Sequence, residues 1–113
     1  MSNAVFNDNE KLQLLDNFYA IADAKNWHPN HTPKNLAAAL SVEAGELLAL
    51  FQWSDDKGFD TIVESKNAVA QEMADIAIYL LVLADKAGID LGAAMLEKSQ
   101  HNAARFLSSH SEN

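Results

Sequence analysis

The chain has 113 residues, of which 49% are hydrophobic and 21% are charged, a composition typical of one globular domain. Sixteen acidic residues against eight basic ones give a net charge of -8. A nucleic-acid backbone is bound through clustered lysine and arginine, so this composition predicts no nucleic-acid partner. Cysteine is absent, which excludes disulfides, thiolate metal sites and a thiol nucleophile.

The first residues of the chain carry no targeting signal. Residues 1–4 lack the basic start and apolar stretch of a signal peptide. The longest apolar run, residues 76–84, is far shorter than the roughly 20 residues that span a bilayer. The sequence therefore predicts a cytoplasmic protein with no membrane partner.

Four helices are predicted from apolar residues that recur with helical spacing. They cover about residues 9–25, 33–53, 60–87 and 91–106. Thr32 and Pro33 are typical of a helix start, Gly88 of a helix end, and Asp90 of an N-cap. No alternating pattern indicates a strand. We expect an all-α fold resembling a four-helix bundle, formed by one domain over residues 1–113, with residues 1–7 and 108–113 flexible.

The second and third predicted helices are apolar on nearly every side. Such helices need burial on every side, and one four-helix chain does not easily provide it twice. We therefore expect a homo-oligomer, with a tetramer favoured and a dimer as the alternative. In a competing interpretation, the alanine-rich faces simply pack against the other two helices of the same chain.

Two pairs of carboxylates interrupt these apolar helices. Glu43 and Glu46 are the only charged residues between positions 36 and 54, and Glu72 and Asp75 are the only ones between 68 and 84. Each pair is three residues apart, so its members share one helix face. That face is the one that also carries leucines such as Leu36, which places the acids toward the core.

Four buried carboxylates need compensation, and the chain has one arginine to offer. The remaining possibilities are protonation or a divalent cation. Four oxygen ligands without histidine or cysteine suit a hard cation, so we expect Mg²⁺, with Mn²⁺ as the alternative. If the helix phase were misjudged, the four acids would instead be ordinary surface residues.

Further motifs extend this pattern, and together they resemble the MazG-like nucleotide pyrophosphohydrolases, in particular the dCTP pyrophosphatase branch. The motifs are Trp27-x-x-x-His31-x-Pro33-x-Asn35-Leu36, Glu43-Ala44-Gly45-Glu46-Leu47, Leu50-Phe51-Gln52-Trp53, Glu72-x-x-Asp75-Ile76-Ala77-Ile78-Tyr79-Leu80 and Lys98-x-x-x-Asn102-x-x-Arg105. The resemblance covers about residues 18–106. Two positions depart from the family pattern: Val42 stands where an acid is frequent, and Phe106-Leu107 replaces Tyr-Pro.

The resemblance implies an oligomeric, Mg²⁺-dependent enzyme that hydrolyses a nucleoside triphosphate to the monophosphate and diphosphate. The substrate that it implies is dCTP or a related or modified deoxynucleotide. It implies that the four carboxylates are both the metal ligands and the catalytic residues. It also implies a nucleotide pocket and phosphate contacts. The pocket residues would be Trp27, His31, Trp53, Tyr79 and Asn102, and the phosphate contacts Lys98 and Arg105.

Other interpretations remain open at this stage. The enzyme could sanitise the nucleotide pool by removing other noncanonical triphosphates, or the chain could be a non-catalytic helical module that binds metal or nucleotide. Taken alone, Trp53 is explained equally well by packing, and the stripe of Lys98, Asn102 and Arg105 by solvent exposure. His28, His101 and His110 are expected to be isolated surface residues.

Overall fold

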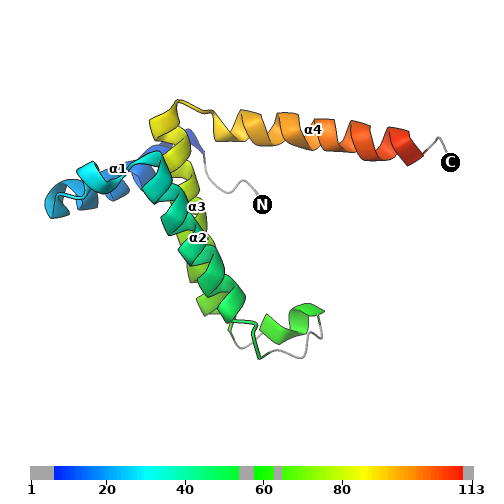
Figure 1. Ribbon diagram of the computed structural model, residues 1–113, viewed down its shortest axis with the longest axis horizontal. Coiled ribbons are helices and arrows are strands. Elements are labelled where there is room, and N and C mark those ends of the chain that lie inside the picture. Colours follow the sequence, from blue (N-terminus) through cyan, green and yellow to red (C-terminus); the bar gives the residue numbers. More distant parts are fainter. Residues whose placement is uncertain (1–6, 54–57, 63–64, 111–113) are drawn as a thin grey trace. The chain divides into compact units, whose positions relative to one another are not determined.

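The computed structural model describes residues 7–53, 58–62 and 65–110. These residues form α-helices and short 3-10 helices, and the described part of the chain contains no strand (Figure 1). The predicted all-α fold is therefore confirmed. In chain order the elements are α1 (Asp8–Lys25), η1 (His28–Asn30), α2 (Pro33–Ala49), η2 (Gly58–Ile62), α3 (Lys66–Ala87) and α4 (Leu91–His110).

The starts of three helices are fixed by side chains that accept hydrogen bonds from otherwise unpaired backbone N–H groups. Before α1, the Asn7 side chain accepts from the Glu10 backbone at 2.9 Å, and the Glu10 carboxylate accepts from the Asn7 backbone at 2.9 Å. The predicted caps Thr32 and Asp90 are confirmed, since each accepts from a backbone N–H three residues later, at 3.2 Å and 3.0 Å.

The chain divides into two compact units, residues 1–83 and 84–113. The first unit contains a small apolar core between α1, α2 and α3. In this unit α2 and α3 run side by side in opposite directions (Figure 1). Its buried side chains are Leu15 and Ala22 of α1, Leu36 of α2, and Val69, Leu81 and Val82 of α3. The buried residues of α2 and α3 lie on the helix faces that were predicted to carry the acids.

Three predicted helix boundaries were wrong. The second helix ends at Ala49, not at 53. The backbone N–H groups of residues 50–52 donate to carbonyl oxygens three residues back, which is the 3-10 pattern and not the α-helical one. The third begins at Lys66, since Gly58–Ile62 forms the separate 3-10 helix η2. The fourth continues to His110, with the Ser108 hydroxyl donating to the Ala104 carbonyl within the helix. Residues 108–110 thus belong to α4, while residues 1–6 and 111–113 lie outside the described residues.

Among the described helices, α3 alone is long and apolar enough to cross a membrane by length and composition. A core helix of a soluble protein passes the same test, so this property does not decide between the two environments. The side of α3 that faces α2 carries carboxylates, which are costly in hydrocarbon. Cytoplasmic location and the absence of a membrane partner stay predictions.

Candidate metal and nucleotide site

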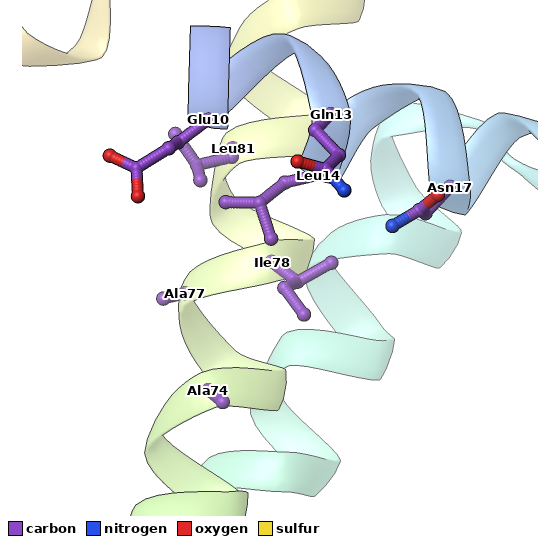
Figure 2. Close-up of a pocket in the computed structure, with 8 residues that line it drawn as sticks. All are labelled: Glu10, Gln13, Leu14, Asn17, Ala74, Ala77, Ile78 and Leu81. Atoms are coloured by element: carbon purple, nitrogen blue, oxygen red, sulfur yellow. The ribbon is translucent and has the colours of Figure 1, made fainter. Parts of the chain in front are cut away.

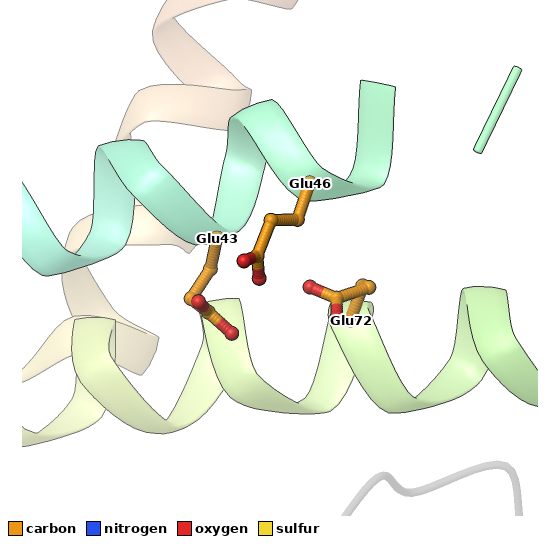
Figure 3. Close-up of side chains that lie close together, drawn as sticks. All are labelled: Glu43, Glu46 and Glu72. Atoms are coloured by element: carbon orange, nitrogen blue, oxygen red, sulfur yellow. The ribbon is translucent and has the colours of Figure 1, made fainter. Parts of the chain in front are cut away.

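Three of the four predicted metal ligands converge where α2 and α3 pack together. Glu43 and Glu46 extend from α2, and Glu72 extends toward them from α3 (Figure 3). One carboxylate oxygen from each of these residues lies within 4.8 Å of the others. We call Glu43, Glu46 and Glu72 the acidic cluster. The two helices thus bring together acids that are 26 residues apart in sequence.

The fourth predicted ligand, Asp75, lies beside the acidic cluster but outside the group of three converging oxygens. It is placed one turn after Glu72 on α3, and a side-chain hydrogen bond with Asp75 is one of the contacts that raise the pKa of Glu43. Asp75 is therefore within reach of Glu43. A change of its side-chain rotamer would bring its carboxylate toward the other three.

The acidic cluster holds protons more tightly than isolated carboxyl groups do. A hydrogen bond with Glu46, followed by burial and by the charges of nearby acids, raises the pKa of Glu43 from 4.5 to about 7. Burial, followed by the charge of Glu46, also raises the pKa of Glu72. A neighbouring lysine or arginine would have the opposite effect. Among the described residues, no lysine or arginine forms an ion pair with these carboxylates.

The carboxylates are less buried than the sequence predicted. Glu43 and Glu72 are half-buried, whereas Glu46 and Asp75 are exposed. The expectation that all four carboxylates are buried is therefore not met in the single chain, where Glu46 and Asp75 are exposed. One atom is nevertheless enclosed: Oε2 of Glu72 is shielded from solvent and has no hydrogen-bond partner among the described residues.

These observations test whether the residues fit a divalent cation. The donors are all carboxylate oxygens, one of them is shielded and unpartnered, and every resolved pKa shift in the acidic cluster is upward. Mg²⁺ binds oxygen at about 2.1 Å and needs its ligands somewhat closer together than the cluster spacing, which small rotamer changes can supply. The donor set therefore fits a hard cation.

A row of aromatic rings extends from the acidic cluster to the segment between α1 and α2. Tyr79 of α3 is half-buried, and its pKa is raised by burial and by the charges of Glu43 and Asp75. Its ring lies 5.9 Å from Phe18 of α1, which in turn lies 5.2 Å from His31. The structure thus connects two predicted pocket residues, Tyr79 and His31, through Phe18.

Trp27 completes the row at its outer end. Its ring lies 6.4 Å from that of His31 in an edge-to-face arrangement, and 46% of the residue is exposed. Sequence reasoning missed Phe18 as part of this group because its spacing from Leu15 and Ala22 indicated an ordinary core position. Its ring contacts with His31 and with Tyr79, which lies on a helix distant in sequence, assign Phe18 to the row.

The other predicted substrate residues are not brought together with these rings. Trp53 lies in the turn after α2 and is 90% exposed. Lys98 and Asn102 line a shallow pocket on α4, and the Arg105 guanidinium lies 4.6 Å from the centre of the adjacent Phe106 ring. These three residues belong to the second unit, so their contribution to the same site stays a prediction.

A second pocket, of about 420 Å³, lies between α1 and α3 (Figure 2). Its residues on α3 point away from the acidic cluster, because Ala77 and Leu81 lie roughly opposite Glu72 at 100° per residue. Its lining is mostly apolar and includes the Glu10 carboxylate, which would repel a triphosphate. We therefore place the candidate nucleotide site at the acidic cluster. The pocket lining consists of Glu10, Gln13, Leu14, Asn17, Ala74, Ala77, Ile78 and Leu81.

Comparison with known proteins shows the family of the chain. Residues 38–112 match the MazG-like family. The chain belongs to the MazG-like family. The match includes the acidic cluster and Asp75, but it begins after Trp27 and His31, so the segment between α1 and α2 lies outside it.

Curated relatives and a solved structure extend the likeness. The chain is 37% identical over 90 residues to dCTP pyrophosphatase 1 of Homo sapiens and 39% identical over 88 residues to that of Bos taurus. Each match covers 75% of this chain and 52% of the relative, so the chain spans about half the length of these relatives.

A crystal structure of a pyrophosphatase from Archaeoglobus fulgidus is similar in fold, with a TM-score of 0.77 and 37% sequence identity. The likeness covers 94% of this chain and 98% of that one. This MazG-like chain therefore shares nearly its whole described fold with a protein of that description, including the segment that precedes the family match.

Proposed function

We propose that this MazG-like chain is a Mg²⁺-dependent nucleoside triphosphate pyrophosphohydrolase. It would convert a nucleoside or deoxynucleoside triphosphate and water to the monophosphate and diphosphate. The observation that carries the proposal is the convergence of three carboxylate oxygens within 4.8 Å of one another, with no lysine or arginine paired to them in the described part of the chain.

Charge explains why such a protein would use a cation. A triphosphate is repelled by a protein of net charge -8, and most strongly by the acidic cluster itself. We propose that Glu43, Glu46, Glu72 and Asp75 hold Mg²⁺, with Mn²⁺ as a possible substitute. When bound, the cation would supply the positive charge that attracts the phosphates and polarises the phosphoryl group under attack.

In the reaction, a water oxygen would form a bond to the α-phosphorus as the bond between that phosphorus and the α–β bridging oxygen breaks. The leaving group is diphosphate, and a proton leaves the water. One of the four carboxylates would accept this proton, since no histidine, cysteine or lysine lies among them. In the metal-free protein Glu43 holds a proton up to about neutral pH, because its pKa is about 7.

We propose that the nucleoside lies along the aromatic row, where Trp27, His31 and Tyr79 offer ring faces and polar ring atoms. Trp53 and Asn102 are further proposed contacts, and Lys98 and Arg105 would approach the phosphates. Because the mammalian relatives are dCTP pyrophosphatases, dCTP or a related deoxynucleotide is the first substrate to examine. Another noncanonical triphosphate is the alternative.

We also propose that the chain forms a cytoplasmic homo-oligomer, with a tetramer favoured over a dimer. Large apolar side chains on α2 and α3 are exposed in the single chain, among them Val42 at 59%, Leu48 at 72% and Met73 at 57%. Exposed apolar surface of this kind is covered in stable assemblies. Light scattering coupled to size-exclusion chromatography would give the mass, and a monomer would contradict the proposal.

The function itself is tested by incubating the protein with ribo- and deoxynucleoside triphosphates, with Mg²⁺ or with EDTA. Diphosphate and orthophosphate are measured separately. We expect Mg²⁺-dependent release of diphosphate, with dCTP or a modified relative preferred. Release of orthophosphate alone would contradict cleavage at the α-phosphorus. If no triphosphate were cleaved, a non-catalytic binding role would replace the enzymatic one.

A further inference from the structure

The most informative feature outside the acidic cluster is His28, which the sequence predicted to be an isolated surface residue. His28 does lie at the surface, with its side chain 38% exposed, but it is not isolated. The Nε2 atom of His28 lies 2.6 Å from Oδ1 of Asp23, and its ring stacks on Tyr19 at 6.2 Å with an interplanar angle of 29°. Tyr19 and Asp23 are one helical turn apart on α1, so both face His28. We call Tyr19, Asp23 and His28 the His28 clasp.

The clasp joins a short element to a long one. His28 is the first residue of η1, a 3-10 helix of three residues, whereas Tyr19 and Asp23 belong to the 18-residue helix α1. Short 3-10 helices have poor hydrogen-bond geometry and little stability of their own. The position of such an element therefore depends strongly on side-chain contacts with its neighbours.

Hydrogen bonds to backbone carbonyls fix the chain just before η1 and at its last residue. Before η1, the Trp27 backbone donates to the Ala22 carbonyl at 2.8 Å, which closes the end of α1. At the last residue of η1, the Asn30 carbonyl accepts from the Asn35 side chain at 2.8 Å, from the first turn of α2. The clasp adds a contact between the first residue of η1 and α1.

Two proposed nucleotide contacts flank the clasp in sequence. Trp27 immediately precedes His28, and His31 follows η1 directly. The centres of the His28 and His31 rings lie 6.4 Å apart, and the His31 ring centre lies 5.2 Å from that of Phe18. A displacement of η1 would therefore move both Trp27 and His31 relative to Phe18 and Tyr79.

We propose that Asp23 and His28 are positioning residues that hold Trp27 and His31 in the arrangement that binds the nucleoside. This inference rests on the proposed function, which assigns Trp27 and His31 to the substrate. Neither Asp23 nor His28 touches the substrate in this account. When only a fraction of the molecules has the competent arrangement, the apparent affinity is the intrinsic affinity multiplied by that fraction.

The kinetic test compares Asp23→Ala and His28→Ala with the wild type, using dCTP and saturating Mg²⁺. We expect KM to rise about twofold to fivefold with kcat unchanged, since an exposed side-chain contact of this kind contributes modestly. The KM of the double variant should be no higher than that of the more affected single variant, because both substitutions remove the same contact. His28→Gln can still donate a hydrogen bond and should restore part of the affinity.

The matched control is Asp16→Ala, which removes the same charge from an exposed position on the same helix. We expect it to leave KM and kcat unchanged. A similar rise in KM in this control would show that net charge, and not the clasp, affects substrate binding. A fall in kcat together with a fall in the melting temperature would overturn the positioning role in favour of a structural one.

A second measurement is independent of catalysis, and it separates a failure of this inference from a failure of the proposed function. With Trp53→Phe, Trp27 is the single tryptophan. Adding Asp23→Ala to this variant should increase acrylamide quenching and lower the fluorescence anisotropy of Trp27, while circular dichroism shows an unchanged helix content. Unchanged Trp27 fluorescence would overturn the inference whether or not the protein cleaves triphosphates. Changed fluorescence in a protein that cleaves nothing would contradict the proposed function and support the clasp.

Discussion

The acidic cluster and the His28 clasp place carboxylates in opposite electrostatic situations. In the clasp, Asp23 has a partner within the chain, since the His28 ring lies 2.6 Å away. In the acidic cluster, Glu43, Glu46 and Glu72 lie beside one another and Asp75, and no lysine or arginine of the described residues pairs with them. The hydrogen bond with Glu46, burial and the neighbouring acids raise the pKa of Glu43 to about 7. The carboxylate of the clasp has its partner without a ligand, whereas the acidic cluster holds protons until a cation replaces them.

The difference separates two roles within one proposed site. A carboxylate whose partner is present stabilises a local arrangement and contributes modestly to folding. A group of like charges destabilises the protein alone and becomes favourable only when a cation binds. Substitutions in the acidic cluster should therefore abolish activity without destabilising the metal-free protein, and substitutions near the clasp should have small effects on both.

The largest expected effect comes from Glu72→Gln. This change keeps the shape of the side chain but removes the charge of the carboxylate whose Oε2 atom is shielded and unpartnered within the described residues. We expect Mg²⁺-dependent hydrolysis to fall roughly a hundredfold or more, as for loss of a group that stabilises developing charge. The rate of diphosphate release measures this.

The melting temperature of metal-free Glu72→Gln is the accompanying control, and it should be equal to or above that of the wild type. Removing one of several repelling charges does not weaken the fold. Retention of full activity in a folded variant would contradict the assignment of Glu72.

The next effect concerns the pH dependence of stability in EDTA. The folded pKa of Glu43 lies above the ordinary value of 4.5, so folded Glu43 keeps a proton that the unfolded chain has already lost. Its contribution to stability is therefore fully present below pH 4.5 and is lost as the pH rises to about 7. We expect the melting temperature to fall over this range.

In Glu43→Gln this part of the fall should be absent, since glutamine does not titrate. Glu97→Gln on α4 is the matched control and should retain the slope of the wild type. With excess Mg²⁺ the fall should shrink or reverse, because the cation competes with the proton. Parallel profiles for the wild type and Glu43→Gln would contradict the pKa assigned to Glu43.

A smaller effect on stability is expected at Thr32, which follows η1 and caps α2. The Thr32 hydroxyl accepts a hydrogen bond from the Asn35 backbone at 3.2 Å. Thr32→Ala should reduce the free energy of unfolding by about 1 kcal/mol, measured by urea denaturation. Ser41→Ala is the matched control: the Ser41 hydroxyl donates to the Ala37 carbonyl inside the helix, so its loss should be neutral or slightly stabilising. Equal losses would contradict the capping role.

The smallest effect is expected at Asn26, which ends α1 with a left-handed backbone at φ 56° and ψ 44°. Glycine adopts this conformation freely, so Asn26→Gly should change the free energy of unfolding by only a few tenths of a kcal/mol. Asn26→Ala should cost about 1 kcal/mol, because alanine is strained there. Equal stability of the two variants in urea would contradict the strain argument.

Sequence reasoning could predict the acidic cluster because its information is local. Glu43 and Glu46 share a helix face with the buried Leu36, and Glu72 shares one with the buried Val69. Helical spacing alone therefore predicts that both pairs of acids lie on faces that point toward the core. How deeply they are buried depends on which other elements cover the α2–α3 contact, and spacing within one helix does not contain that information.

The aromatic row and the clasp depend on contacts that cross a turn or join distant helices. The pairing of His28 with Asp23 requires the chain to reverse at Asn26, and the role of Phe18 requires α1 to meet Tyr79 of α3. Neither follows from periodicity. Helix ends such as Ala49 were also missed, because a few backbone hydrogen bonds decide them and not the apolar pattern.

Binding of Mn²⁺, followed by electron paramagnetic resonance, tests whether the acidic cluster holds a divalent cation. The wild type should bind Mn²⁺ saturably near pH 7.5, Mg²⁺ should displace it, and Glu72→Gln should bind it far more weakly while remaining folded. Equal binding by the wild type and by variants of Glu43, Glu46 and Glu72 would contradict the account, because the cation would then lie elsewhere.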